Sequence, residues 1–146
     1  MKRKLLLLLV IIFIGIQFVP VNLNQSEQEQ KDDIIVTENP PQEIALLLKI
    51  SCYDCHSNNS EYPWYDKIAP VSWWVAHHID EAKDELNFSE WATFTSKRKN
   101  HKLKEMMEVL DEGEMPLKSY LIMHGNAKVS AEQVEQLKSW INTIKE

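Results

Sequence analysis

The 146-residue chain contains little glycine and almost no cysteine. Its three glycines are too few for the many tight turns of an extended β structure. They form no phosphate-binding loop, and the sequence has no nucleophile elbow and no pair of carboxylates placed for acid–base catalysis. Internal repeats are absent as well. These absences favour one small helical domain and give no indication of an enzyme.

The charge of the chain is unevenly distributed. The net charge at pH 7 is −6, although Lys2, Arg3 and Lys4 lie together near its beginning. The part that follows is therefore more acidic than the whole, which argues against a nucleic acid as partner. Such a surface fits either a basic protein partner or simple solvation.

Residues 1–21 consist of a basic start and an apolar continuation. No charge interrupts the stretch from Leu5 to Val19, as in a secretory signal or a signal anchor. No small-residue cleavage site and no lipidation cysteine follow, so we expect an uncleaved anchor in the inner membrane; the alternative is a removed signal and a secreted protein. A helix of this length rises about 22 Å, less than the roughly 30 Å of a hydrocarbon core. In both cases the remainder is expected on the periplasmic, extracytoplasmic side.

Residues 22–41 are rich in Gln, Glu and Asp and end in Asn39-Pro40-Pro41. They have no sustained apolar period, so we interpret them as a polar linker. The only apolar run, Ile34 to Val36, is long enough to touch a domain but too short to do more. The domain itself is then expected at residues 42–146.

The two cysteines stand three residues apart, in Cys52-Tyr53-Asp54-Cys55-His56. A Cys-x-x-Cys-His sequence is the attachment signature of a c-type haem. The two thiols can add to the vinyl groups of the porphyrin, and the histidine can supply one axial nitrogen to the iron. The sequence therefore predicts one covalent haem c per chain, held by Cys52, Cys55 and His56. The alternatives are a disulfide or thioredoxin-like redox pair, and a zinc site completed by a distant histidine.

Apolar residues at helical spacing predict an all-α fold around this motif. The expected helices are one that follows Pro41 and leads into the motif, one from Ser72 as N-cap to about Leu86, a short one with a capping box of Asn87 and Glu90, one from Ser96 to a stop at Gly113, a short one from Leu117 to Met123, and one with a capping box of Ser130 and Gln133. A first helix carrying the haem motif and packed on a final amphipathic helix is the architecture of small c-type cytochromes.

An aromatic segment follows the motif. Tyr62, Trp64 and Tyr65 lie among prolines, which prevent one continuous helix. We expect these three rings to line the haem and keep water from it, because a small domain offers few other apolar surfaces for them.

The sixth ligand of the iron is predicted to be Met115. Pro116 restricts the backbone of Met115 to extended conformations, so that a loop can present the thioether. Met106 and Met107 lie on a helical stripe and are expected in the core. The weaker alternatives are one further methionine and four histidines, Met123, His77, His78, His101 and His124. A Met/His pair favours electron transfer, whereas an open position permits gas or peroxide chemistry.

Beyond the Cys-x-x-Cys-His signature, the chain contains several longer motifs. They are Cys-Tyr-Asp-Cys-His-Ser-Asn-Asn, Tyr-Pro-Trp-Tyr, Ile-Ala-Pro-Val-Ser-Trp-Trp, Leu-Asn-Phe-Ser-Glu-Trp and Gly-Glu-Met-Pro-x-x-x-Tyr. From about Pro41 onward, the chain resembles the bacterial haem-binding domain family related to cytochrome c. The resemblance implies one covalent haem outside the cytoplasm. It carries over Cys52, Cys55 and His56 directly, and Met115 by its place in the Met-Pro loop.

Together these features predict a membrane-anchored monohaem protein that carries single electrons and catalyses no reaction. Its expected partners are a redox protein, which the sequence does not identify, and the membrane, without nucleic acid. The alternative function is a redox or gas sensor, in which Met115 leaves the iron. A peroxidase-like enzyme is a further alternative, but the sequence shows no distal acid–base residues for it.

Overall fold

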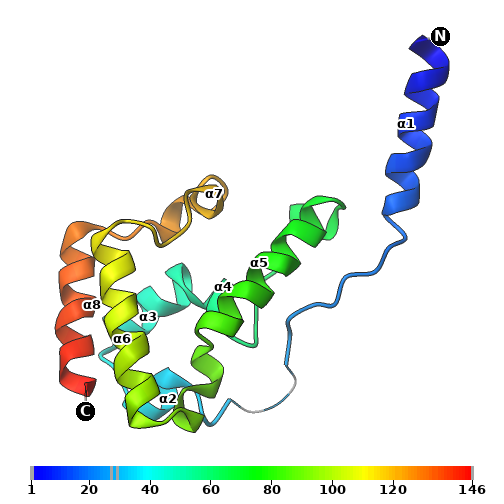
Figure 1. Ribbon diagram of the computed structural model, residues 1–146. Helices are drawn as coiled ribbons and strands as arrows, with labels where there is room; N and C mark the ends of the chain where they lie inside the picture. Colours follow the sequence, from blue (N-terminus) through cyan, green and yellow to red (C-terminus); the bar gives the residue numbers. More distant parts are fainter. Residues whose placement is uncertain (1, 27, 29, 146) are drawn as a thin grey trace.

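The computed structural model describes residues 2–26, 28 and 30–145 (Figure 1). Within these residues every regular element is a helix, and a single β-bridge joins Gln25 to Asn59. The prediction of an all-α fold is therefore confirmed. In chain order the α-helices and 3-10 helices (η) are α1 (Lys2–Ile16), α2 (Ile34–Glu38), α3 (Gln42–Ser51), α4 (Tyr53–His56), η1 (Trp64–Lys67), α5 (Val71–Glu85), η2 (Phe88–Thr93), α6 (Ser96–Asp111), α7 (Lys118–Leu121), η3 (Gly125–Ala127) and α8 (Ala131–Ile144).

The hydrophobic core lies among α2, α3, η2, α6 and α8. Figure 1 shows α8 beside α6, and α8 also contacts α3. The largest apolar side chains that are fully buried are Ile34, Leu48, Phe88, Trp91, Leu103, Leu137 and Ile141. Each such side chain contributes about 1.5–3 kcal/mol by leaving water. This core fixes the frame on which the cysteine motif is held.

Local sequence signals set the ends of α6 and α8. The side chain of Thr95 caps α6, and Gly113 follows its end with a φ of +67°, a conformation that suits glycine. The predicted capping box of α8 is present, since the Ser130 and Gln133 side chains each accept a hydrogen bond from the other's backbone N–H. Both helices turn their apolar stripes toward the core.

One predicted N-cap and one predicted capping box are wrong. α5 begins at Val71, and Ser72 is a buried residue inside its first turn instead of the N-cap. The preceding Pro70 occupies the cap position, because proline suits a helix start without needing a side-chain hydrogen bond. Asn87 does cap η2, but its side chain accepts from Ser89 N–H at 3.1 Å and makes no capping box with Glu90.

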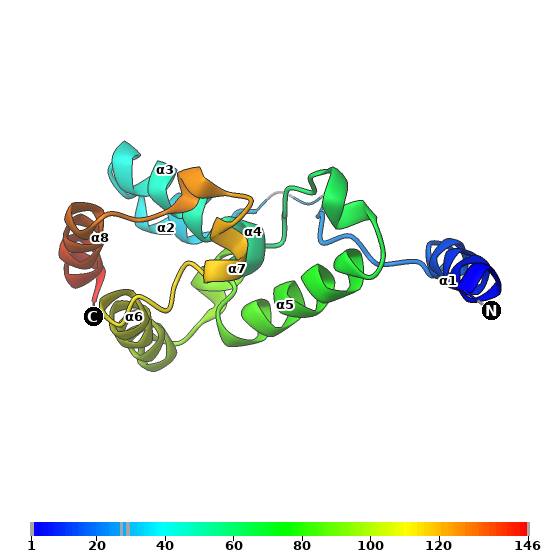
Figure 2. The same cartoon turned by 90° about the horizontal axis from the view of Figure 1, so that it is seen from above.

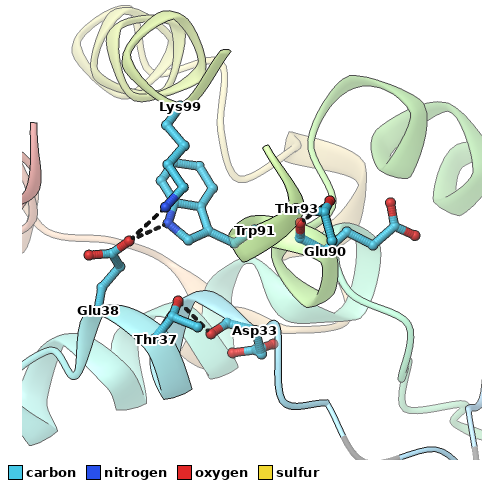
Figure 3. Close-up of polar contacts among 7 residues, drawn as sticks. All are labelled: Asp33, Thr37, Glu38, Glu90, Trp91, Thr93 and Lys99. Atoms are coloured by element: carbon cyan, nitrogen blue, oxygen red, sulfur yellow. Dashed lines mark hydrogen bonds and ion pairs between the residues drawn. The ribbon is translucent and has the colours of Figure 1, made fainter. Parts of the chain in front are cut away.

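The segment predicted as a linker includes a helix that packs in the core. Ile34 of α2 is fully buried, and Asp33 caps the helix with its side chain. Figure 3 shows how Glu38 accepts a hydrogen bond from Trp91 Nε1 at 2.7 Å, with Lys99 Nζ at 3.4 Å from the same oxygen. These contacts tie α2 to η2 and α6, so this part of the chain belongs to the folded body.

The chain just before α2 also lies along the loop that follows the motif. Ser26 N–H donates to Asn58 O at 3.0 Å, and Ser60 N–H donates to Asn24 O at 2.9 Å. The Asn24 side chain adds hydrogen bonds to Ser57 O and Ser60 Oγ. The loop at residues 57–60 is therefore held from outside the predicted domain boundary.

Helix α1 projects from the folded body at the end where α5 begins (Figures 1 and 2). Its described side chains are almost all exposed and apolar after the first basic residues. In the part of the chain that the structure describes, no helix combines the length and apolar character needed to cross a membrane.

Candidate haem site

The cysteine motif lies where α3 ends and the single turn α4 begins. Cys52 follows the last residue of α3, and its carbonyl accepts hydrogen bonds from Cys55 N–H at 3.2 Å and His56 N–H at 3.0 Å. Residues three and four apart share one face of a helical turn. Both sulfurs and the imidazole therefore lie along the same cavity.

The two thiols are poorly suited to thiolate chemistry. Burial, with a smaller contribution from neighbouring charge, raises the pKa of Cys52 to about 12 and that of Cys55 to about 11. Redox-active and zinc-binding cysteines need a stabilised thiolate instead. Among the described residues, no group of three or more His, Cys, Asp or Glu side chains is placed to hold a metal. The redox-pair and zinc alternatives therefore gain no support.

The His56 ring is held in one orientation. Its Nδ1 lies 2.9 Å from Leu86 O, so Nδ1 carries the proton and donates it to that carbonyl. Burial lowers the pKa of His56, which keeps the ring neutral near pH 7. The Phe88 ring packs against it with centroids 5.9 Å apart. This arrangement leaves Nε2 with a lone pair for a metal, as metal-binding histidines require.

Three cavities meet at the motif and form what we call the groove. The first, of about 210 Å³, is lined mainly by apolar side chains of α3, α6 and α8 together with Cys52 and His56. The second, of about 50 Å³, contains Cys52, Cys55 and His56. The third, of about 150 Å³, continues from Cys55 between α5 and α7. Because neighbouring cavities share lining residues, the groove passes continuously over the motif.

Met115 lies in the same groove as His56. It is in the loop between α6 and α7, and its side chain lines the first and second cavities. Figures 1 and 2 together place α7, which follows this loop, over α4. Met106, as expected, is buried in the core, and Met107 packs against that core. Met123 lines only the third cavity among the three.

The other histidines differ in their access to the groove. His77 and His101 are exposed and pair with Glu81 and Glu105 on their own helices. His78 and His124 do line the groove. His124 lines only the third of these cavities and its Nε2 is hydrogen-bonded with Tyr65 Oη, whereas His78 also lines the second cavity beside the cysteines. Of the four histidines, His78 is therefore the best placed alternative to Met115.

Of the three rings expected to line the haem, Tyr62, Trp64 and Tyr65, only Tyr65 lines a cavity of the groove. Tyr65 lines the third cavity. Trp64 is 70% exposed and lines none of the three cavities. The Tyr62 hydroxyl accepts a hydrogen bond from Asn24 N–H at 2.7 Å, so this ring serves the loop after the motif. The η1 turn separates the three side chains, which sequence spacing did not reveal.

With this geometry in view, the comparison with protein families is decisive. The family model described as "Haem-binding domain" matches residues 11–143. The chain belongs to this haem-binding domain family. No curated protein and no solved structure matches the chain. The family match begins inside α1 and includes residues 22–41, which agrees with the packing of α2 in the core of this haem-binding domain.

The groove of this haem-binding domain fits a haem. Its walls are apolar, which suits the face of a porphyrin, and polar atoms contribute little of the lining. The protonated Nδ1 of His56 directs the free Nε2 lone pair away from Leu86. Both cysteine sulfurs remain unpaired. These are the donor atoms that a c-type haem would need.

Sequence reasoning missed the role of Asp54 inside the cysteine motif. Its carboxylate accepts hydrogen bonds from Tyr120 Oη at 2.7 Å and Glu61 N–H at 3.0 Å. Tyr120 is the tyrosine of the Met-Pro-x-x-x-Tyr motif, so this contact fastens α7 to α4. No sequence spacing pairs Asp54 with Tyr120, which lie 66 residues apart, so only the folded chain reveals this hydrogen bond. It holds the Met115 loop over the groove.

Two further motifs are joined in a similar way. Asn87 Nδ2 donates to Asn58 Oδ1 at 2.9 Å, and Asn58 N–H donates to Ser89 Oγ at 3.0 Å. Asn58 follows the cysteine motif, whereas Asn87 and Ser89 belong to the motif that contains Leu86. These hydrogen bonds therefore hold Leu86, whose carbonyl orients the His56 ring, beside the cysteine motif that contains His56.

Proposed function

We propose that this haem-binding domain attaches one haem covalently and carries single electrons on the extracytoplasmic side of a membrane. The observation that carries this proposal is the groove in which Cys52, Cys55, His56 and Met115 meet. When bound, the haem iron supplies reversible one-electron chemistry. The residues of the chain attach the group, orient the axial donors and exclude water.

Each of the four residues has a distinct part in this proposal. Cys52 and Cys55 would form the two thioethers, for which protonated thiols are suitable because the sulfur adds across a vinyl group together with its hydrogen. His56 would bind the iron through Nε2, and Met115 through its thioether. A methionine in place of a second histidine raises the reduction potential, which suits an electron carrier.

Side chains able to transfer a proton line the first two cavities, but they are held by one another or by the backbone. Lys102 pairs with Glu85 and Glu105 in the first cavity. In the second cavity Tyr120 donates to Asp54, and His78 Nδ1 lies 2.9 Å from Trp74 O. We therefore propose electron transfer without a bond-changing reaction. The acidic surface, with a net charge of −6, suits a basic redox partner protein. The apolar α1 and its basic start support attachment to the membrane.

A denaturing gel stained for haem tests the attachment. The full chain, expressed with a haem-maturation system, should give a haem band at its own mass. The double variant Cys52→Ser with Cys55→Ser should be exported but give no band, because it has no sulfur to form a thioether. A band retained by the double variant would contradict covalent attachment. A known c-type cytochrome made in the same cells controls for maturation.

A sensor function is favoured by one observation. Met115 lies in a loop and remains partly exposed at 37%, so it could leave the iron without unfolding a helix. Carbon monoxide distinguishes the two functions. For a carrier, the spectrum of the reduced protein should not change when carbon monoxide is added. Rapid binding would show that the sixth position opens and would favour the sensor.

A further inference from the structure

Large apolar side chains are exposed where α1 joins the folded body. The docking surface, as we name it, consists of Phe18, Trp64, Ile68, Val71 and Trp74. Phe18 is 82% exposed and Trp64 is 70% exposed. Trp64 and Ile68 line none of the three cavities, so the groove does not account for their exposure. An apolar surface of this kind marks a site of interaction.

The end of α1 is fastened to this surface by a pair of hydrogen bonds. Gln17 Nε2 donates to Ala69 O at 3.1 Å, and Gln17 Oε1 accepts from Ala69 N–H at 3.0 Å. Ala69 lies between Ile68 and Val71 in sequence and is buried. Figures 1 and 2 both show α1 next to the end of the body where α5 begins. The chain therefore leaves α1 at the docking surface.

The composition of the surface points to a lipid interface. Tryptophan is enriched at the boundary between hydrocarbon and headgroups, where its ring is apolar and its N–H is polar. The exposed Lys67 lies within the surface and can attract anionic headgroups. α1 rises only about 22 Å, and a helix shorter than the hydrocarbon core draws its flanking residues toward the bilayer. Phe18 is such a flanking residue, and the Gln17–Ala69 hydrogen bonds hold the segment that follows Trp64 beside it.

We propose that the docking surface rests in the interfacial layer of a phospholipid bilayer, beside the point where α1 enters it. This inference rests on the proposed membrane attachment. Val71 and Trp74 also line the third cavity. With the docking surface in the bilayer interface, the third cavity therefore lies next to the lipid surface, and α6 and α8 face away from it.

Spin labels on the haem-loaded full chain test the proposal. Trp64→Cys and, as a matched control, Leu46→Cys would each carry a nitroxide in vesicles of phosphatidylcholine and phosphatidylglycerol. Leu46 is also an exposed apolar residue, at 56%, but lies on α3 away from the docking surface. Oxygen concentrates in lipid, whereas a nickel chelate stays in water. The label at position 64 should show a several-fold higher ratio of oxygen to nickel collisions than the label at position 46.

A charge in the docking surface should abolish this difference. Adding Ile68→Glu to the labelled Trp64→Cys chain should return the label to a water-exposed signature, whereas Val36→Glu on α2 should leave it unchanged. Equal, water-exposed signatures at positions 64 and 46 in vesicle-bound protein would overturn the docking proposal. Protection from nickel without access to oxygen, growing with the protein-to-lipid ratio, would also overturn it and indicate a second copy of the chain. Failure of the full chain to bind vesicles would instead contradict membrane attachment.

Discussion

His56 and Met115 reach the groove for different physical reasons. His56 is placed by local geometry, because it lies four residues after Cys52 on one helical turn and its ring is fixed by Leu86 O. Met115 is placed by a distant contact, because the Tyr120–Asp54 hydrogen bond holds its loop over α4. The position of His56 is therefore rigid, whereas the position of Met115 depends on tertiary contacts.

Replacing Met115 tests the sixth ligand. Met115→Ala should remove the sulfur-to-iron charge-transfer absorption and lower the reduction potential on the order of 0.1 V, because the axial ligand sets much of that potential. Absorption spectroscopy and redox titration measure both effects. Met123→Ala is the control, since Met123 is exposed and lines only the third cavity of the groove. Persistence of the band in Met115→Ala would assign the position to another residue, with His78 the first to test.

Asp66 gives the domain a pH dependence of stability. Its side chain is buried, one oxygen has no hydrogen-bond partner, and burial raises its pKa against a weaker opposing effect of His124. At pH values between the ordinary aspartate pKa and the raised pKa of Asp66, the folded protein keeps a proton on Asp66 that the unfolded chain has lost. Stability therefore falls as the pH rises through that window.

Asp66→Asn should abolish this fall in stability with rising pH. At neutral pH the variant should be more stable than the parent, by about 1–3 kcal/mol if the buried carboxylate is the unsatisfied group. The difference should vanish at a pH below the ordinary aspartate pKa, where both states of the parent are protonated. Urea denaturation at several pH values measures it. A variant that is less stable at every pH would show that the carboxylate has a partner in solution.

At the scale of elements, α2 shows how a short apolar run can become part of the hydrophobic core. The run from Ile34 to Val36 is too brief to announce a helix, yet Asp33 caps it and Ile34 fills the core beside Trp91. The polar residues around it made the segment look like a linker. Its helix is stabilised mainly by what it packs against, as is usual for very short helices.

Removing the buried side chain of α2 should destabilise the whole domain. Ile34→Ala should lower the free energy of unfolding by about 2–4 kcal/mol, because it leaves a cavity in the core. Val36→Ala, at a position that is 63% exposed on the same helix, should change it by less than about 0.5 kcal/mol. Urea denaturation of the haem-loaded protein measures both. Equal effects would show that α2 does not belong to the cooperative unit.

At the scale of the whole molecule, α1 is structurally separate from the folded body (Figures 1 and 2). The side chains of α1 bury nothing in the body, and the side-chain hydrogen bonds that link its end to the body join Gln17 to Ala69. The family match nevertheless begins inside α1. We therefore expect α1 to decide where the protein is held, and the body to decide what it binds.

Exchanging α1 for a cleavable export signal should separate these tasks. With residues 2–16 replaced, the chain should still acquire haem and unfold at an unchanged urea midpoint. Cell fractionation should find it released from membranes by a salt wash, whereas the parent chain should stay in the membrane pellet. If the parent chain is also released, the membrane attachment proposed through α1 is wrong.

Much of the fold and site was predictable because it depends on local spacing. The distances of three and four residues from Cys52 to Cys55 and His56, the apolar stripes of α6 and α8, and the Ser130 capping box act within one or two helical turns. Such signals need no knowledge of the rest of the chain. They determined an all-α haem-binding domain.

Contacts between distant residues decided the rest. Only packing could show that Ile34 lies in the core, that Leu86 O orients His56, and that Tyr120 holds the Met115 loop through Asp54. Likewise, the exposure of Trp64 follows from its place in the η1 turn, not from its aromatic neighbours in sequence. The sequence by itself determined which group the domain binds, because that chemistry is local. The tertiary structure decided how the groove is closed and which surface meets the membrane in our proposal, because those depend on residues far apart in the chain.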